Sequence, residues 1–321
     1  MRDILRFGRV LLLLFIIASL LPYLIPASGN LLKTQDLTTA ESRFMTVDNT
    51  TLHYHYFQTG NPEGTVVFVH GFGGSLFSFR NNCLPLVEEG YNVLLVDLPG
   101  FGLSERSLRA DYSNEGRARL LKNLADELTL PDPVHWVGHS MGGSILAWLP
   151  IFYPDSAGSL TLIAAPYHVQ PSAPWTQTVL RYPPVQEYLK AVLPRFITKE
   201  RVGSLLSSAY GRPLKEYEVY GYLNPLLVEN THRTYVGLTR DRSSQRPPAT
   251  SLTTPVLLIW GEEDTWVPPT NAPLWCSDIP NCTIALFAGA GHNLMETHTE
   301  QFNTRLKEFI LSTAIESEST P

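Results

Sequence analysis

A serine flanked by glycines is the first residue of this chain whose surroundings favour chemistry. The segment WVGHSMGGS, residues 136–144, places Ser140 in the pattern Gly-x-Ser-x-Gly directly after a short apolar run. Such a serine can occupy a sharp turn between a strand and a helix, where bulky neighbours would collide with the backbone. The turn would expose the hydroxyl, so Ser140 is a candidate nucleophile. The pattern alone also fits an ordinary Ser/Gly loop, and its context must decide.

A serine nucleophile needs a base that takes its proton and an acid that orients the base. His292, one of nine histidines, follows the last predicted strand on the small-residue loop AGAGHNLME. Loops at the carboxyl ends of strands reach the crevice of an open α/β sheet, which favours His292 as the base. For the acid, the spacing from Gly261 to Pro268 in IWGEEDTWVPP favours Asp264. Asp97, at the end of another strand, is the weaker alternative.

A second glycine-rich segment, FVHGFGGS, follows the first predicted parallel strand. Its small residues allow backbone N–H groups to face a developing negative oxygen, an interaction worth several kcal/mol of barrier. We assign this oxyanion hole to the N–H of Phe72, with Gly73 as the alternative, and to the N–H of Met141. A phosphate-binding loop is excluded as an interpretation, because the sequence contains neither GxxxxGK[ST] nor GxGxxG.

Alternating strand and helix patterns must position these residues. Short apolar runs, read as strands buried on both faces, occur at residues 65–70, 91–97, 133–138, 159–164, 255–261 and 282–289. Helical patterns lie between them, at residues 118–128, 144–152 and 300–311. This alternation predicts a mostly parallel, doubly wound α/β sheet. The alternating polarity of residues 42–47 and 52–58 predicts an antiparallel hairpin before it.

One long interval, residues 167–250, has helical patterns and no strong strand pattern. We interpret it as a helical cap inserted into a core formed by residues 30–166 and 251–321. Large apolar side chains in the cap either contact an apolar acyl or aromatic group of a substrate or form the cap's own core: Trp175, Leu180, Tyr182, Leu189 and Phe196.

The N-terminal segment, residues 1–29, indicates export. Three arginines precede the uncharged apolar residues 10–25. This stretch is intermediate in length between a signal-peptide core and a bilayer span of about 20 residues, so a cleaved signal, with a cleavage site near residues 27–29, and a membrane anchor both remain open; an anchor is slightly favoured. The basic residues predict a cytoplasmic N-terminus, and therefore a membrane-anchored or secreted catalytic domain on the non-cytoplasmic side.

The composition of the chain limits the classes of partner and metal site that it can be expected to have. A net charge of −6 without basic clusters argues against nucleic-acid binding. The sequence lacks CxxC motifs and His/Cys clusters, so no metal site is predicted. Cys276 and Cys282 enclose five residues and either form a small disulfide loop or remain two thiols, with Cys83 unpaired in the first case.

Five motifs in order, HGFGG, DLPGFGLS, GHSMGG, GEEDTWVP and GAGHNL, resemble the α/β-hydrolase superfamily over residues 43–311. The chain order Ser140, Asp264, His292 matches its triad. The resemblance implies a serine nucleophile, an acyl-enzyme, no cofactor and a cap that shapes the substrate pocket. Serine at position 140 differs from the aspartate of the superfamily's epoxide hydrolases and haloalkane dehalogenases, and HSMGG differs from the proline iminopeptidase elbow. The topology is similar to membrane-bound hydrolases of the monoacylglycerol lipase kind.

The predicted function is hydrolysis of carboxylic esters, including acylglycerols or other apolar acyl esters, with a small-molecule ester as the partner. One alternative is a carbon–carbon bond hydrolase of the ring-fission type, which carries the same triad. Another is a ligand-binding protein without activity, an interpretation that a missing triad residue would favour; none is missing.

Overall fold

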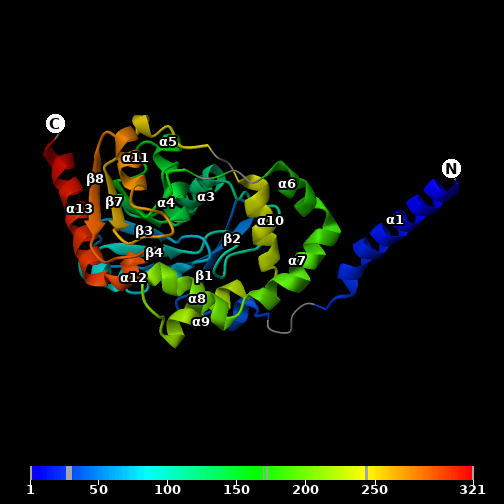
Figure 1. Ribbon diagram of the computed structural model, residues 1–321. Helices are drawn as coiled ribbons and strands as arrows, with labels where there is room; N and C mark the ends of the chain where they lie inside the picture. The colour runs from blue at the N-terminus through cyan, green and yellow to red at the C-terminus, as the bar shows by residue number, and fades with distance from the viewer. Residues whose placement is uncertain (1, 27–30, 169, 171–172, 243–244, 320–321) are drawn as a thin grey trace.

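The computed structural model describes residues 2–26, 31–168, 170, 173–242 and 245–319. Its centre is an eight-stranded sheet in the order β1-β2-β4-β3-β5-β6-β7-β8 (Figure 1). The strands are β1 (Arg43–Val47), β2 (Thr50–Phe57), β3 (Thr65–Val69), β4 (Asn92–Val96), β5 (Val134–His139), β6 (Ser159–Ile163), β7 (Val256–Gly261) and β8 (Cys282–Phe287). β2 is antiparallel to both of its neighbours, and the other pairs are parallel. The predicted hairpin and the mostly parallel sheet are both confirmed.

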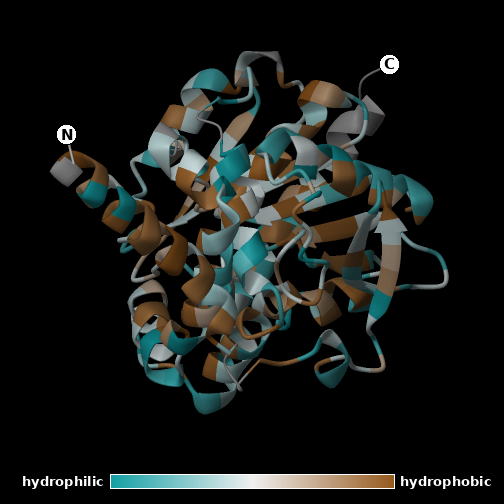
Figure 2. Ribbon diagram, turned by 90° about the vertical axis from the view of Figure 1, so that its right-hand side faces the viewer, coloured by the Kyte–Doolittle hydropathy of each residue, from teal (hydrophilic) through white to brown (hydrophobic). Residues whose placement is uncertain are grey.

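Every residue of the strands β3 to β7 is buried, because helices cover both faces of the sheet. Brown, hydrophobic strand segments run through the interior of the molecule in the hydropathy view (Figure 2). The prediction for residues 282–289 is wrong in one respect: in β8, Ile284 and Leu286 are exposed. β8 is the edge strand, with a neighbour on one side only, and the apolar composition of the run could not show that position.

Thirteen α-helices are described. They are α1 (Arg2–Leu20), α2 (Cys83–Glu88), α3 (Asn114–Glu127), α4 (Met141–Leu146), α5 (Leu149–Phe152), α6 (Pro174–Arg181), α7 (Pro183–Phe196), α8 (Lys199–Tyr210), α9 (Glu216–Leu226), α10 (Thr231–Asp241), α11 (Asn271–Asp278), α12 (Leu294–Thr297) and α13 (Thr299–Ser319). The helix predicted over residues 144–152 is divided between α4 and α5. Pro150 lies in the first turn of α5, where a missing N–H costs least.

Five of these helices, α6 to α10, lie between β6 and β7, in the interval interpreted as the cap. α8 and α9 enclose a small apolar core of their own, separate from the core around the sheet. α10 packs against both α6 and α7. In Figure 1, α6, α7 and α10 stand on the side of the domain from which α1 projects.

The N-terminal helix continues into a short 3-10 helix, η1 (Leu21–Leu24). Residues Ile4–Leu24 form the one described helical segment that is long and apolar enough to cross a membrane. The small residues 27–29 of the predicted cleavage site lie outside the described residues. At the β8 edge of the sheet, a disulfide joins Cys276 to Cys282. Cys83, in α2, is a buried thiol.

Candidate active site

Ser140 lies at the turn between β5 and α4 with a backbone conformation that L-residues rarely adopt, φ 51° and ψ −117°. Residues held in such regions cost about 1–3 kcal/mol and persist only where the surrounding structure fixes them. Here the Ser140 N–H donates to the Ile163 carbonyl at 2.7 Å, and the Ser140 carbonyl accepts from Ser144 N–H at 3.2 Å. Ser140 therefore lies in the sharp strand-to-helix turn that the sequence predicted, and the structure adds that its backbone is strained.

The glycines around Ser140 are required by close approach of the backbone. A Cβ on Gly142 would lie 2.4 Å from the Val69 carbonyl oxygen, and one on Gly138 would lie 2.7 Å from Gly143 N. Neither backbone neighbour can move without displacing a buried strand or the first turn of α4. Small residues at these positions thus let the elbow pack directly on β3.

Asp264 and His292 come together from two neighbouring loops. His292 Nδ1 lies 2.7 Å from Asp264 Oδ2, and both side chains are buried. The other carboxylate oxygen of Asp264 accepts the N–H groups of Trp266 and Val267, at 2.8 and 2.9 Å. The carboxylate is thereby fixed in one orientation and presents its remaining oxygen to the imidazole.

His139, the residue before Ser140, connects the elbow to the His292 loop. Its Nε2–H donates to the His292 carbonyl at 3.1 Å, and the two rings lie 4.7 Å apart between centroids. Burial and the neighbouring His292 hold the pKa of His139 well below its usual value, so the ring is neutral. The Ser140 hydroxyl itself has no hydrogen-bond partner within the described chain. Contacts between nucleophile and base are often loose before substrate binds.

A cavity of about 580 Å³ opens beside the elbow and is lined by Ser140, Met141 and Phe72. Met141 is the first residue of α4, and N–H groups of a first helical turn lack partners within the helix. The Phe72 N–H also has no partner among the described residues. Both amides are therefore available to a bound oxygen. Gly73, the alternative donor, is not among the lining residues that the structure describes.

Asp97, the alternative acid, bonds to a different histidine. His53 Nδ1 lies 2.7 Å from Asp97 Oδ2, and His53 Nε2 lies 2.9 Å from Ser42 Oγ. Burial opposes charge on Asp97, but the hydrogen bond and charge of His53, among other groups, outweigh it and lower its pKa. Leu76 N–H and Leu103 N–H also donate to this carboxylate. Ser42, unlike Ser140, is not at a strand-to-helix elbow, and the group borders a separate cavity.

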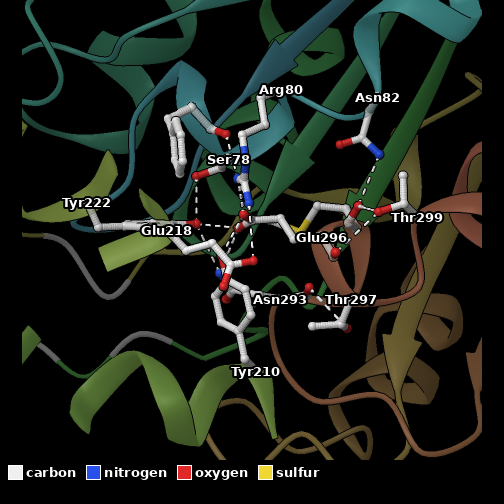
Figure 3. A network of polar contacts seen from close by, with 12 residues as sticks. Ser78, Arg80, Asn82, Tyr210, Glu218, Tyr222, Asn293, Glu296, Thr297 and Thr299 are labelled. Carbon is white, nitrogen blue, oxygen red and sulfur yellow. Dashed lines mark hydrogen bonds and ion pairs between the residues drawn. The ribbon is translucent and has the colours of Figure 1, made fainter. Parts of the chain in front are cut away.

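Glu296 is the centre of a buried polar cluster that includes Asn293, the residue after His292 (Figure 3). Its carboxylate accepts hydrogen bonds from Arg80, Tyr222, Tyr210 at 2.5 Å and Asn293 at 3.1 Å. Burial raises the pKa of Glu296, and the ion pair with Arg80 opposes this shift. The cluster joins the segment after the HGFGG loop, the cap helices α8 and α9, and the loop that carries His292.

Several of these contacts were not anticipated from sequence. Trp266 stacks on His292 with ring centroids 5.4 Å apart, and its indole N–H donates to Ser208 in α8. His70 donates from Nδ1 to the Gly71 carbonyl and accepts Leu98 N–H at Nε2, which fixes the HGFGG loop against the loop after β4. Both residues stand inside the quoted motifs, and that position was the available signal. No group of three or more metal-binding side chains occurs in the described chain.

Neither interpretation of the large apolar cap residues holds for Trp175 and Phe196, whose side chains are exposed. None of the five lines the Ser140 cavity, and none belongs to the small core between α8 and α9: Trp175, Leu180, Tyr182, Leu189 and Phe196. Trp175 is 68% exposed and Phe196 56%. Other cap residues line the cavity, among them Tyr235 and Leu238 on α10 and His168 before α6. Sequence periodicity shows that a helix has an apolar face but not which neighbour that face meets.

Comparison with known proteins identifies the family to which the chain belongs. The profile of the alpha/beta hydrolase fold matches residues 64–299, well over half of the chain. The chain belongs to the α/β-hydrolase family. This match confirms the resemblance drawn from the five motifs and makes the protein a hydrolase.

The relatives and solved structures that resemble this α/β-hydrolase are named for several different hydrolase activities. An uncharacterized hydrolase, YugF, of Bacillus subtilis is 30% identical over 272 residues, which cover 84% of this chain and 97% of the relative. A 2-hydroxy-6-oxononadienedioate/2-hydroxy-6-oxononatrienedioate hydrolase of Cupriavidus pinatubonensis is 28% identical, over 84% of this chain and 95% of its own. Among solved structures, an esterase from Exiguobacterium antarcticum has a TM-score of 0.66 at 19% identity, over 83% of this chain and 98% of its own. The structure of a membrane phospholipase A has a TM-score of 0.70 at 22% identity, over 98% of this chain and 99% of its own. At these identities the structural matches show a shared fold.

Proposed function

We propose that this α/β-hydrolase cleaves carboxylic esters with apolar acyl groups through an acyl-enzyme on Ser140. The observation that carries the proposal is the strained elbow of Ser140 at the wall of a cavity, together with the buried Asp264–His292 pair, whose loop is bonded to His139, the residue before Ser140. Strained backbone at a cavity is typical of functional sites. The apolar side chains of Phe72, Met141 and Leu238 in the cavity wall favour an apolar acyl group.

In the proposed reaction, Ser140 Oγ attacks the ester carbonyl carbon while His292 Nε2 accepts the hydroxyl proton. Asp264 keeps Nδ1 protonated and stabilises the imidazolium. The N–H groups of Phe72 and Met141 donate to the oxygen that gains negative charge. The bond to the leaving oxygen then breaks, and His292 returns the proton to the departing alcohol. A water molecule, deprotonated by the same histidine, hydrolyses the acyl-enzyme and restores Ser140.

The proposal places the catalytic domain outside the cytoplasm, with the N-terminal segment as its membrane attachment and residues 167–250 as the cap over the site. Three arginines before the apolar span support a cytoplasmic N-terminus. The Cys276–Cys282 disulfide supports an oxidising compartment, because disulfides persist there and are rare in the cytosol.

The test is hydrolysis of p-nitrophenyl acetate, butyrate, octanoate and palmitate by the full chain in detergent, together with labelling by a fluorophosphonate. Activity and labelling are expected in the wild type and absent in Ser140→Ala, with an optimum at a medium or long acyl chain. A folded wild type that neither turns over an ester nor reacts with the probe would overturn the proposal.

Ser42→Ala is a matched control, because Ser42 has its own hydrogen-bonded histidine and aspartate but neither the elbow nor the amides of Phe72 and Met141. This variant is expected to keep ester hydrolysis and labelling. If labelling is lost in Ser42→Ala and kept in Ser140→Ala, the assignment of the nucleophile is wrong.

A carbon–carbon bond hydrolase is the second candidate. It is favoured by the relatives named as 2-hydroxy-6-oxononadienedioate/2-hydroxy-6-oxononatrienedioate hydrolases. Two arginines, Arg117 and Arg242, line the Ser140 cavity and are the groups that a substrate with two carboxylates would need. Arg117 is engaged already, by Ser113, Asn114 and Met141, which favours the ester. Turnover of a ring-fission dienoate without ester hydrolysis would select this candidate instead.

A further inference from the structure

The outer corner of the cap, where α6 meets α7, carries apolar and aromatic side chains that remain exposed to a large extent. Trp175 and Val179 are one helical turn apart on α6, and Tyr182 lies at the junction with α7; they are 68%, 42% and 38% exposed. We call these three residues the cap corner. Exposed apolar and aromatic groups clustered in this way mark an interaction surface.

The cap corner lies against the N-terminal helix. The Tyr182 ring stacks on Phe15 with centroids 6.0 Å apart, and its hydroxyl is 2.7 Å from Ser19 Oγ. At the far end of α7, Arg195 donates to the Pro26 carbonyl at 3.2 Å. α7 therefore runs beside residues 15–26 in the same direction, with the cap corner at the end that is deeper in the apolar segment.

This contact fixes the height of the cap corner relative to a bilayer. Phe15 precedes Leu24, the last residue of the membrane-compatible segment, by nine residues, or about 14 Å at 1.5 Å per residue. Tilting by up to about 40° shortens that depth only by about a quarter. Any pose that inserts the apolar segment therefore carries Tyr182 below the membrane surface.

From this geometry we infer that the cap corner enters the outer leaflet of a lipid bilayer, at the boundary between headgroups and acyl chains. Trp and Tyr are enriched at this boundary, where amphipathic rings contact both phases. Arg181, next to Tyr182, is exposed, and a long basic side chain at this boundary can reach lipid phosphates.

An inserted cap corner would also determine how the Ser140 cavity is oriented relative to the membrane. α10 packs on both α6 and α7 and supplies Tyr235 and Leu238 to the wall of the Ser140 cavity. A cap corner held in the bilayer thus places this wall close to the lipid surface. The inference rests on the proposed membrane attachment of the N-terminal segment, but it is independent of the proposed chemistry, because it holds whether or not Ser140 acts on esters.

The experiment uses the full chain in vesicles of phosphatidylcholine and phosphatidylglycerol, with and without phospholipids brominated in their acyl chains, which quench nearby tryptophan fluorescence. The chain has six tryptophans, and Trp136, Trp260 and Trp275 are deeply buried. Brominated lipid is expected to reduce the wild-type signal, and most of that loss is expected to be absent in Trp175→Phe. Trp266→Phe is the matched control, since Trp266 is partly exposed but lies at His292; it should be quenched like the wild type.

Equal quenching of the wild type and Trp175→Phe would overturn the inference. So would rapid disulfide pairing of a Val179→Cys variant in the vesicles, because a second copy of the chain, not lipid, would then cover the cap corner. Neither readout depends on catalysis, so the inference and the proposed function fail separately. An inactive protein whose Trp175 is quenched would refute only the chemistry.

Discussion

His292 Nδ1 and Asp264 Oδ2 lie 2.7 Å apart, and both side chains are shielded from water. Asparagine at position 264 would keep the shape but offer an NH₂ group or a neutral oxygen to the ring. We expect Asp264→Asn to reduce kcat by about 10⁴-fold, because the wrong imidazole tautomer would be stabilised. Ester hydrolysis measures the loss, and thermal unfolding should change little. Glu263→Gln, an exposed neighbour, is the control, and equal activity of both variants would contradict the assignment.

Glu296, whose side chain is fully buried, balances the charge of Arg80, whose side chain is 17% exposed. Removing one partner of a buried ion pair is expected to lower the free energy of unfolding by about 3–5 kcal/mol. The loss for Glu296→Gln should be near the lower end of this range. Glu218 lies 3.8 Å from the same guanidinium and would still partly balance its charge. Urea unfolding measures the effect, with the exposed Glu300→Gln as control. If the two variants unfold at the same urea concentration, the cluster does not stabilise the fold as described.

Gly142 packs against the carbonyl oxygens of Val69 and His70, at 2.4 and 2.6 Å from the position of an added Cβ. Gly142→Ala is expected to destabilise the protein by about 1–3 kcal/mol through overpacking and to abolish fluorophosphonate labelling. Gly203→Ala in α8 is the control, because its nearest neighbour would be 3.6 Å away. Alanine there should stabilise α8 by about 0.5–1 kcal/mol. Full labelling of Gly142→Ala would show that the elbow tolerates a wider turn.

Acid should destabilise the protein through its buried histidines. Burial lowers the pKa of His135 to about 4, and burial together with nearby cations does the same for His232. An unfolded histidine, with a pKa near 6.5, binds a proton in a range where these folded side chains do not. Stability is therefore expected to fall as pH decreases from about 6.5 to 4.

Urea midpoints between pH 7.5 and 5 measure this dependence. His135→Gln, which keeps a polar group near Ser159, should show a shallower fall than the wild type. The same slope in both proteins would mean that other groups, such as carboxylates, cause the loss.

The order of strands and helices and the positions of Ser140, Asp264 and His292 after strand ends were readable from sequence, because apolar periodicity and turn-forming glycines are local properties of the chain. The five motifs also identified the family. Their spacing was enough to predict that the three side chains would approach one edge of the sheet.

Tertiary structure decided what depends on contacts between distant segments. Asp97 bonds to His53 instead of His292, and Glu296 meets Arg80 across 216 positions of sequence. Trp175 faces outward instead of toward a substrate or a core. Such contacts depend on how whole helices and strands pack against one another. Composition and periodicity predict that an element has an apolar face, but not which surface that face contacts.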